Sequence, residues 1–299
     1  MKVFVAGAGG FIGSRLVEFL GELGHEVAFH VRSESGDLTE NSIPEDTRVV
    51  VNSAGRLGGK DADLSELKLA NASLPVMLAD RCSRTGAHLI HLSTPGVTGL
   101  AADADEEMEY DPRGDYERTK AQGEQAILTH SIMAEGLLTV LRPDFVYGPG
   151  DLHKLPLFRH VAGGFMPVIG REGARIRPTY RDDVCRAVEA SLPGGRLCGG
   201  LFNIAGPETV TVRGLSLMIA DAIGRKVRIL PLPKVVFRLA LLLGPLCPSS
   251  LSQSRLRLFG DDHFVSIKKA ESVSFSPVWT LRKGLDATVS WYLRNGLIR

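Results

Sequence analysis

Short runs of β-branched and apolar residues alternate with helical stretches through the first half of the chain, and this alternation constrains the fold most strongly. The expected strands are Lys2–Ala6, Glu26–Val31, Thr47–Asn52, His88–Leu92 and Leu137–Leu141. The expected helices are Phe11–Leu23, a long region that ends near Thr85, and Asp115–Ala134. Strands this apolar are buried on both faces, and strand–helix alternation is typical of a parallel sheet covered by helices. The sequence therefore predicts an α/β fold with a doubly wound parallel sheet.

A glycine-rich run follows the first expected strand directly and leads into the first expected helix. Glycines stand at positions 7, 10 and 13 of this run (GAGGFIG). They let the backbone turn tightly and approach a pyrophosphate, while the helix N-terminus offers unpaired N–H groups to a phosphate. The run therefore predicts a Rossmann-like dinucleotide site, for which we select Gly7, Gly10, Phe11, Ile12, Gly13 and, after the third strand, Ala54.

The end of the second strand bears on the choice of dinucleotide. An acidic residue there accepts hydrogen bonds from the adenosine ribose of NAD, whereas an arginine pairs with the 2′-phosphate of NADP. The sequence reads His30-Val31-Arg32-Ser33 and has no acid before Glu34. Arg32 therefore favours NADP and leaves NAD open; the alternative is that Arg32 is a solvated surface residue.

A tyrosine and a lysine stand four residues apart, at Tyr116 and Lys120, on one face of an expected helix. A neighbouring ammonium is expected to lower the pKa of the phenol, so that Tyr116 exchanges a proton with a substrate oxygen. The hydroxyls of Ser93 and Thr94 close the preceding strand at the edge where ligands bind such sheets. We interpret Thr94, Tyr116 and Lys120 as a catalytic set; the alternative is a plain surface pair on the helix.

Charge and cysteine content exclude several other classes. Lys plus Arg is 35 and Asp plus Glu is 34, so the basic footprint of a nucleic-acid-binding protein is missing. The four cysteines are widely spaced and form no CxxC pair, which favours reduced thiols in a cytoplasmic protein over a disulfide framework or a zinc site. We also expect no cleaved signal at the N-terminus and no bound metal.

The most apolar stretch, Val235–Leu246, contains Arg238 and is cut by Gly244 and Pro245. It is shorter than the ~20 residues needed to cross a bilayer. We expect a buried helix there; a membrane-surface helix or a helix that covers the substrate is the alternative.

The strand–helix alternation breaks up after Pro149, where Gly and Pro are dense through Arg175. One more strand is expected at Phe202–Ala205, and helices are expected at Val212–Ile223 and Leu281–Leu293. We predict a dinucleotide-binding domain over residues 1–150, with segments near 178–206 returning to it. A smaller substrate-binding cap is expected over most of residues 151–299.

Taken in order, these motifs resemble the extended short-chain dehydrogenase/reductase family, in particular its nucleotide-sugar epimerase/dehydratase group, over nearly the whole chain. The residues that carry the resemblance are Gly7/Gly10/Gly13, Ser53-Ala54-Gly55, Asn71, Ser93-Thr94, Tyr116/Lys120, residues 142–150 (RPDFVYGPG), 180–184 (YRDDV) and 202–206 (FNIAG). The resemblance implies that Thr94, Tyr116 and Lys120 are catalytic and that Lys120 also holds the nicotinamide ribose. It further implies that Asp37 and Leu38 lie beside the adenine and that the protein is a homodimer built on the helix that carries Tyr116.

Departures from the family pattern narrow the expected chemistry. Dehydratase relatives carry an acid–base pair after the catalytic threonine, whereas this chain has Pro95-Gly96. Hydride transfer between a hydroxyl and a carbonyl therefore remains, as in a 4-epimerase or a 4-ketoreductase. Arg32 favours the ketoreductase, because reductases in this family commonly use NADPH.

The substrate is less constrained, and we select Asn71, Ser93, Phe145, Arg175 and Arg177 as candidate contacts. Arg175 and Arg177 favour the diphosphate of a nucleotide-linked sugar with reaction at C4, although they can also be plain surface charge. Phe145 replaces an Asn common in nucleotide-sugar enzymes and favours the alternative, a 3β-hydroxysteroid or dihydroflavonol-like dehydrogenase. A non-catalytic NADP-binding scaffold is the third hypothesis.

Overall fold

The computed structural model describes residues 1–58, 63–99, 101–235 and 260–299. Its centre is a six-stranded sheet in which every pairing is parallel, with the order β11-β6-β4-β3-β1-β2. The strands are β1 (Lys2–Ala6), β2 (Glu26–His30), β3 (Val49–Asn52), β4 (His88–Leu92), β6 (Leu138–Pro143) and β11 (Leu201–Ile204). All residues of β3, β4 and β6 are buried, because helices cover both faces of the sheet. The predicted α/β fold with a Rossmann-like doubly wound sheet is confirmed.

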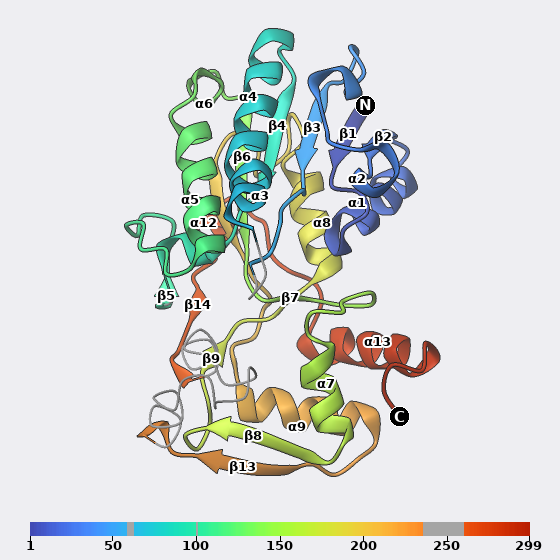
Figure 1. Ribbon diagram of the computed structural model, residues 1–299, viewed down its shortest axis with the longest axis vertical. Coiled ribbons are helices and arrows are strands. Elements are labelled where there is room, and N and C mark those ends of the chain that lie inside the picture. The colour runs from blue at the N-terminus through green and yellow to red at the C-terminus, as the bar shows by residue number, and fades with distance from the viewer. Residues whose placement is uncertain (59–62, 100, 236–259) are drawn as a thin grey trace.

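Two helical layers enclose the sheet (Figure 1). On one face lie α1 (Phe11–Glu22) and α8 (Arg181–Ala190), which pack on each other and on β1 and β3. On the other face lie α4 (Leu74–Thr85) and α5 (Asp115–Leu128), together with α6 (Ser131–Ala134). Strand order reverses between β1 and β3, so a crevice for a ligand is expected at the carboxyl ends of these two strands.

A second apolar cluster lies beyond the carboxyl edge of the sheet, in the lower half of Figure 1. It is built from α7 (Leu155–Ala162), α9 (Val212–Ile223), α13 (Leu281–Arg294) and the parallel pair β8 (Phe165–Ile169) and β13 (Arg228–Leu232). The helices α9 and α13 lie where the sequence predicts them. The helix α7 and the strand β8 fall in the Gly- and Pro-rich stretch and were not anticipated.

Later segments return to the sheet after the chain has entered this second cluster. Strand β11 adds to the edge of the sheet beside β6, and α8 packs on α1. The short strand β14 (Phe264–Val265) pairs with β5 (Ala102–Ala104), and α12 (Lys268–Ser272) packs on β11. The site edge is therefore bordered by segments from both halves of the chain.

Short elements complete the described structure. They are α2 (Arg32–Ser35), η1 (Glu40–Ser42), α3 (Leu64–Lys68), the π-helical turn η2 (Leu69–Ser73), η3 (Pro95–Thr98), β7 (Val146–Tyr147), β9 (Arg175–Ile176), β10 (Thr179–Tyr180) and β12 (Val210–Thr211). The apolar stretch Val235–Leu246 lies outside the described residues from position 236 onward. Within the described ranges, no helix combines the length and apolarity that crossing a membrane requires.

One predicted helix is wrong in its extent. The expected single helix Asp115–Ala134 is two helices, because α5 ends at Leu128 and α6 begins at Ser131. The Thr129 hydroxyl bonds back to the carbonyls of Gln125 and Ala126, and His130 has an extended ψ of 152°. The His130 ring then accepts a hydrogen bond from the Ile132 amide and so caps the second helix.

Candidate active site

The glycine loop forms a tight cradle at the switch point of the sheet. Gly7 follows β1 with a φ of +82°, and a Cβ there would lie 2.6 Å from the backbone of Ala54. A Cβ on Gly13 would lie 2.1 Å from the Gly7 carbonyl oxygen, so helix α1 can approach the loop only with glycine at this position. These contacts explain why the glycine spacing is needed and place Gly7, Gly13 and Ala54 together at the carboxyl end of β1.

The N-terminus of α1 follows this loop without a side-chain cap and without an acidic residue in its first turn. Gly10 donates its N–H to Gly7, and the first intrahelical bond is made by Ser14. The amides of Phe11, Ile12 and Gly13 therefore have no partner within the helix, and the partial positive charge of the helix end is unopposed. This cradle suits a pyrophosphate, so the residues present fit a bound dinucleotide.

Arg181 at the start of α8 lies beside this cradle, and sequence reasoning did not select it. Its guanidinium lies over the Phe11 ring, 5.4 Å from the centroid, and a Cβ on Gly150 would be 3.4 Å from its Nη1. Its Nε is buried without a hydrogen-bond partner in the described structure, and its ion pair with Asp182 is long at 3.7 Å. Asp182 also pairs with Arg15, so Arg181 retains positive charge beside the loop. The sequence motif 180–184 contains this arginine but gives no signal of its position.

Arg32 and its neighbours lie at the end of β2. Arg32 begins α2 and pairs with Asp37 at 3.1 Å, with both side chains more than half exposed. Val31 packs behind the loop, where a Cβ on Gly9 would touch its Cγ1 at 3.0 Å. Leu38 packs against the apolar cluster beneath α4. The end of β2 thus presents a cation with one exposed carboxylate partner.

Thr94 and Tyr116 meet at the carboxyl edge of the sheet. Thr94 follows β4 and caps η3, where its Oγ1 accepts a hydrogen bond from the Gly96 amide at 3.3 Å. Tyr116 lies in the first turn of α5, close enough to Thr94 for the threonine hydroxyl to influence the pKa of its phenol. Both side chains are partly buried, so the pair is not sealed from solvent.

The pKa expected for Tyr116 is wrong in this structure. Burial raises the pKa of the phenol to about 12, the charge of Glu117 adds to this, and only the Thr94 hydroxyl opposes it. Lys120 does not lower it, because its ammonium points elsewhere: Nζ donates to the Leu92 carbonyl at 2.6 Å. Tyr116 is therefore a neutral phenol at physiological pH and is suited to donate a proton.

Lys120 is buried beneath the site. Its Nζ also lies 3.4 Å from Nε2 of His91, which is fully buried in β4. Burial lowers the pKa of Lys120 to about 8, and the charge of Glu124 one turn later on α5 opposes this decrease. The lysine therefore exchanges protons close to neutral pH.

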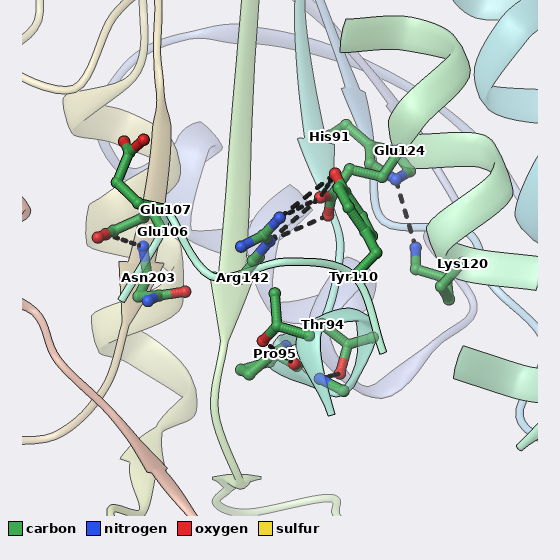
Figure 2. Close-up of polar contacts among 12 residues, drawn as sticks. His91, Thr94, Pro95, Glu106, Glu107, Tyr110, Lys120, Glu124, Arg142 and Asn203 are labelled. Carbon is green, nitrogen blue, oxygen red and sulfur yellow. Dashed lines mark hydrogen bonds and ion pairs between the residues drawn. The ribbon is translucent and has the colours of Figure 1, made fainter. Parts of the chain in front are cut away.

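A buried ion pair lies beside Lys120 and was also missed from the sequence. Figure 2 shows Glu124 of α5 between Arg142 of β6 and Tyr110. Arg142 Nε lies 3.1 and 3.2 Å from the two carboxylate oxygens, and the Tyr110 hydroxyl donates to the same group at 2.5 Å. Glu124 and Arg142 are at most 1% exposed, so this cluster fixes α5 to the sheet. The family-like RPDFVYGPG run contains Arg142, but its partner is 18 residues earlier.

Two of the predicted substrate contacts face inward. Asn71 is fully buried. Its Oδ1 accepts a hydrogen bond from the Arg56 amide, and its Nδ2 donates to the Arg56 carbonyl and to the Thr119 hydroxyl. It thereby holds the loop after β3, which passes Tyr116 at Gly58. Ser93 is buried, and its hydroxyl has no partner among the described residues.

Phe145 occupies a strained position between the sheet and the second cluster. Its φ is +36°, which is unusual for a residue with a large side chain, and Lys154 lies 4.9 Å from its ring centroid. The preceding Asp144 is buried, with one carboxylate oxygen unpartnered in the described structure. Burial raises the pKa of Asp144 to about 7, although backbone N–H groups and the charges of Lys154 and Arg177 oppose this.

Neither predicted arginine is free. Arg175 in β9 pairs with Asp262 at 2.8 Å and lies over the Phe264 ring. Arg177 donates to the carbonyls of Gly206 and Val265, and burial lowers its pKa. Both join β9 and its flanks to later segments. Among the described residues, no group of three or more His, Cys, Asp or Glu side chains is arranged to hold a metal ion.

A sheet wound in this way, with a glycine cradle where the strand order reverses, defines the class of Rossmann-fold dinucleotide enzymes. Within that class, the model of the NAD dependent epimerase/dehydratase family matches residues 3–205. The chain belongs to that family and is an NAD(P)-dependent oxidoreductase or epimerase of the short-chain dehydrogenase/reductase type. The predicted family is confirmed.

Individual relatives differ in what their names describe. A 2-alkyl-3-oxoalkanoate reductase of Stenotrophomonas maltophilia (strain K279a) is 28% identical, covering 86% of this chain and 85% of that protein. A dTDP-4-dehydrorhamnose reductase of Mycobacterium tuberculosis (strain ATCC 25618 / H37Rv) is also 28% identical, covering 75% and 76%. The crystal structure of a Bacillus cereus UDP-glucuronic acid 4-epimerase with UDP-glucuronic acid and NAD has a TM-score of 0.76 at 21% identity, covering 99% and 100%.

Proposed function

We propose that this protein is an NAD(P)H-dependent ketoreductase that acts at C4 of a nucleotide-linked sugar. The observation that carries the proposal is Tyr116, a neutral phenol near Thr94 at the carboxyl edge of the sheet. Reduction of a ketone needs a proton donor at the carbonyl oxygen, and a phenol with a raised pKa stays protonated for that task.

The chain's own residues would act on the carbonyl oxygen. The Thr94 hydroxyl and the Tyr116 hydroxyl both donate hydrogen bonds to it, which polarises the carbonyl and fixes its orientation. A bound nicotinamide supplies the hydride. Tyr116 then passes its proton to the oxygen as negative charge develops there, and water returns a proton to the phenolate.

The sequence after Thr94 supports reduction without loss of water. Pro95 and Gly96 carry no acid or base, and they begin the turn η3 that packs against the start of α5. A Cβ on Gly96 would lie 2.9 Å from Cγ of Glu117, so this position tolerates little besides glycine. Epimerisation at C4 remains the variant of the same chemistry, for which a tightly retained cofactor would supply hydride transfer in both directions.

We further propose that the cofactor is NADP, held by two cations. Arg32 would exchange its exposed partner Asp37 for the 2′-phosphate. Arg181 would contact the pyrophosphate, because it lies over Phe11 at the head of α1 with its Nε unpartnered. Asp37 and Leu38 would flank the adenine, and Gly7, Gly10, Ile12, Gly13 and Ala54 would form the cradle.

Two relatives support the sugar substrate: the dTDP-4-dehydrorhamnose reductase, and a probable dTDP-4,6-dihydroxy-2-methyloxan-3-one 4-ketoreductase of Streptomyces antibioticus that is 31% identical over 64% of this chain. Asn71, Ser93, Phe145, Arg175 and Arg177 remain the proposed substrate contacts. Of these, Phe145 requires the least rearrangement, because Asn71 and Ser93 are buried and the two arginines are already paired.

A lipophilic ketone is the second candidate. Phe145 presents an aromatic ring where an amide is common in nucleotide-sugar enzymes, and Arg175 is already neutralised by Asp262. The oxoalkanoate reductase and a 3beta-hydroxysteroid-dehydrogenase/decarboxylase of Arabidopsis thaliana, 28% identical over 70% of this chain, support this substrate class.

The experiment that separates the candidates is a thermal-shift screen of the NADP-loaded protein. UDP-, dTDP- and GDP-sugars are compared with sterols and long-chain 3-oxo acids, since a ligand stabilises the folded state by mass action. The nucleotide-linked sugar is supported if a nucleotide sugar stabilises the protein more than the free nucleoside diphosphate does at the same concentration. Stabilisation by the lipophilic set alone contradicts it.

A further inference from the structure

A buried line of polar groups runs from the end of β3 to the helix that carries Tyr116. Asn52 and His91 are register partners on the neighbouring strands β3 and β4, and both are fully buried. The Asn52 Oδ1 accepts the Ala54 N–H at 3.2 Å, and its Nδ2 lies 3.0 Å from Nδ1 of His91. The Ala54 amide thus fixes which end of the Asn52 side chain faces the histidine.

This arrangement determines where the proton of His91 lies. An amide nitrogen only donates, so Nδ1 of His91 must accept. Burial and the nearby Lys120 hold the pKa of His91 well below its usual value, and the ring is therefore neutral. Its single proton is on Nε2, the atom that lies 3.4 Å from the Lys120 Nζ (Figure 2).

Glu124 and the Leu92 carbonyl favour the charged form of Lys120, but neither forms an ion pair with it. Glu124 is the carboxylate on its own helix, but Arg142 of β6 and the Tyr110 hydroxyl bond to it. In the described part of the chain, Lys120 forms no ion pair and donates to the Leu92 carbonyl. An imidazole N–H therefore faces an ammonium that has no carboxylate of its own.

We propose that His91, locked by Asn52 with its proton on Nε2, is a positioning residue that presents an N–H to Lys120 and so favours the amine form of that lysine. An ammonium and an N–H that face each other are two donors without an acceptor. Once Lys120 has lost its proton, its lone pair accepts the hydrogen bond from His91.

The effect on turnover rests on the proposed ketoreduction. Tyr116 loses its proton to the new alcohol, and water returns one proton to the phenolate before the next turnover. The imidazole keeps its own proton throughout, so a histidine with no acid–base role of its own sets the acidity of the lysine.

The tautomer can be read directly by ¹⁵N NMR of histidine-labelled protein without cofactor. The expected result is a neutral His91 with a protonated Nε2 and an unprotonated Nδ1 from pH 6 to pH 9. A proton on Nδ1, or a doubly protonated ring, overturns the proposal. This readout needs no variant and does not depend on the substrate.

A second titration tests whether His91 lowers or raises the proton affinity of Lys120. With ¹³C-labelled lysine, His91→Phe is expected to raise the proton affinity of Lys120 about fivefold, the size of one net hydrogen bond. If His91 accepts from the ammonium, the same variant lowers that affinity, which contradicts the proposal. The control is His88→Phe, a buried histidine on the same strand that bonds Thr139 and is expected to leave the titration unchanged.

Turnover supplies the last readout. The alkaline limb of kcat/KM for ketone reduction is expected to move to higher pH in His91→Phe and to stay in place in His88→Phe. If the NMR results hold while no ketone is reduced, only the proposed function fails. If reduction occurs but neither titration moves, only the role of His91 fails.

Discussion

At the residue scale, the chemistry depends on how buried surroundings set protonation. Tyr116 keeps its proton because burial raises its pKa to about 12, and Lys120 loses its proton more readily because burial lowers its pKa to about 8. Adjacent acid and base roles arise when environments shift pKa values in this way. The sequence identified both residues by their spacing but could not show that the ammonium points to Leu92 and His91 instead of the phenol.

The two proposed phosphate cations should be separable by cofactor. We expect Arg32→Ala to weaken NADPH binding about tenfold or more and to leave NADH binding nearly unchanged, because only NADPH carries the 2′-phosphate. Arg181→Gln should weaken both by a similar factor, since both cofactors carry the pyrophosphate. Fluorescence titration of the reduced cofactors checks this. If Arg32→Ala weakens NADPH and NADH binding equally, Arg32 gives no support for NADP. If Arg181→Gln binds both cofactors as tightly as the wild type, Arg181 does not contact the pyrophosphate.

Asp144 should make the protein less stable as pH rises. Its pKa is raised to about 7, so between about pH 4 and 7 the folded state binds more protons than the unfolded state, and the free energy of unfolding falls as pH rises. Asp144→Asn is expected to stabilise the protein by about 1–3 kcal/mol at pH 8 and to have little effect below pH 4. Chemical denaturation at the two pH values measures this. A variant less stable at pH 8 would show that the charged carboxylate is favourably paired.

At the element scale, most strands and the glycine loop could be predicted from the sequence, because apolar β-branched runs and glycine spacing reflect local constraints. The break between α5 and α6 could not, since it depends on Thr129 bonding back to α5 and on the His130 ring as a cap. The short pairings of β5 with β14 and of β9 with β12 were also missed, because they join segments far apart in the chain.

The Glu124–Arg142 pair should be the main polar link between α5 and the sheet. Removing one partner leaves a buried charge, so Glu124→Gln or Arg142→Met is expected to destabilise the protein by about 3–5 kcal/mol. The double variant should cost clearly less than the sum of the two. The exposed pair Arg118–Asp115 on the same helix is the control and should contribute about 0.5 kcal/mol or less. Additive losses in a denaturation double-mutant cycle would contradict the coupling.

At the scale of the whole molecule, the outer faces of α4 and α5 should carry the homodimer contact expected from the family resemblance. A shallow groove of about 500 Å³ between them is lined by Ala72, Ser73, Val76, Met77, Asp80, Gln122 and Ala126. Small residues allow two such helix pairs to approach closely. Ala126→Arg is expected to give monomers in sedimentation analysis, whereas Gln125→Arg, on an exposed position outside the groove, should not. A wild-type monomer at micromolar concentration would refute the dimer.

The sequence predicts the fold better than the substrate contacts. Five of the six strands of the sheet, the loop and Thr94–Tyr116–Lys120 follow from local patterns along the first 150 residues. The substrate contacts do not, because Arg175 and Arg177 are engaged by Asp262, Gly206 and Val265, which no spacing rule connects to them. Sequence alone therefore identifies a reductase or an epimerase better than it identifies the substrate.

The most direct measurement of the central claim is NADPH oxidation with nucleotide-linked 4-keto sugars, comparing the wild type with Tyr116→Phe. The wild type should reduce the ketone, and the variant should lose about 10²–10⁴-fold in kcat while it binds NADPH as tightly as before. Full turnover by Tyr116→Phe, or the absence of NADPH-dependent reduction by the wild type with both sugar and lipophilic ketones, would contradict the account.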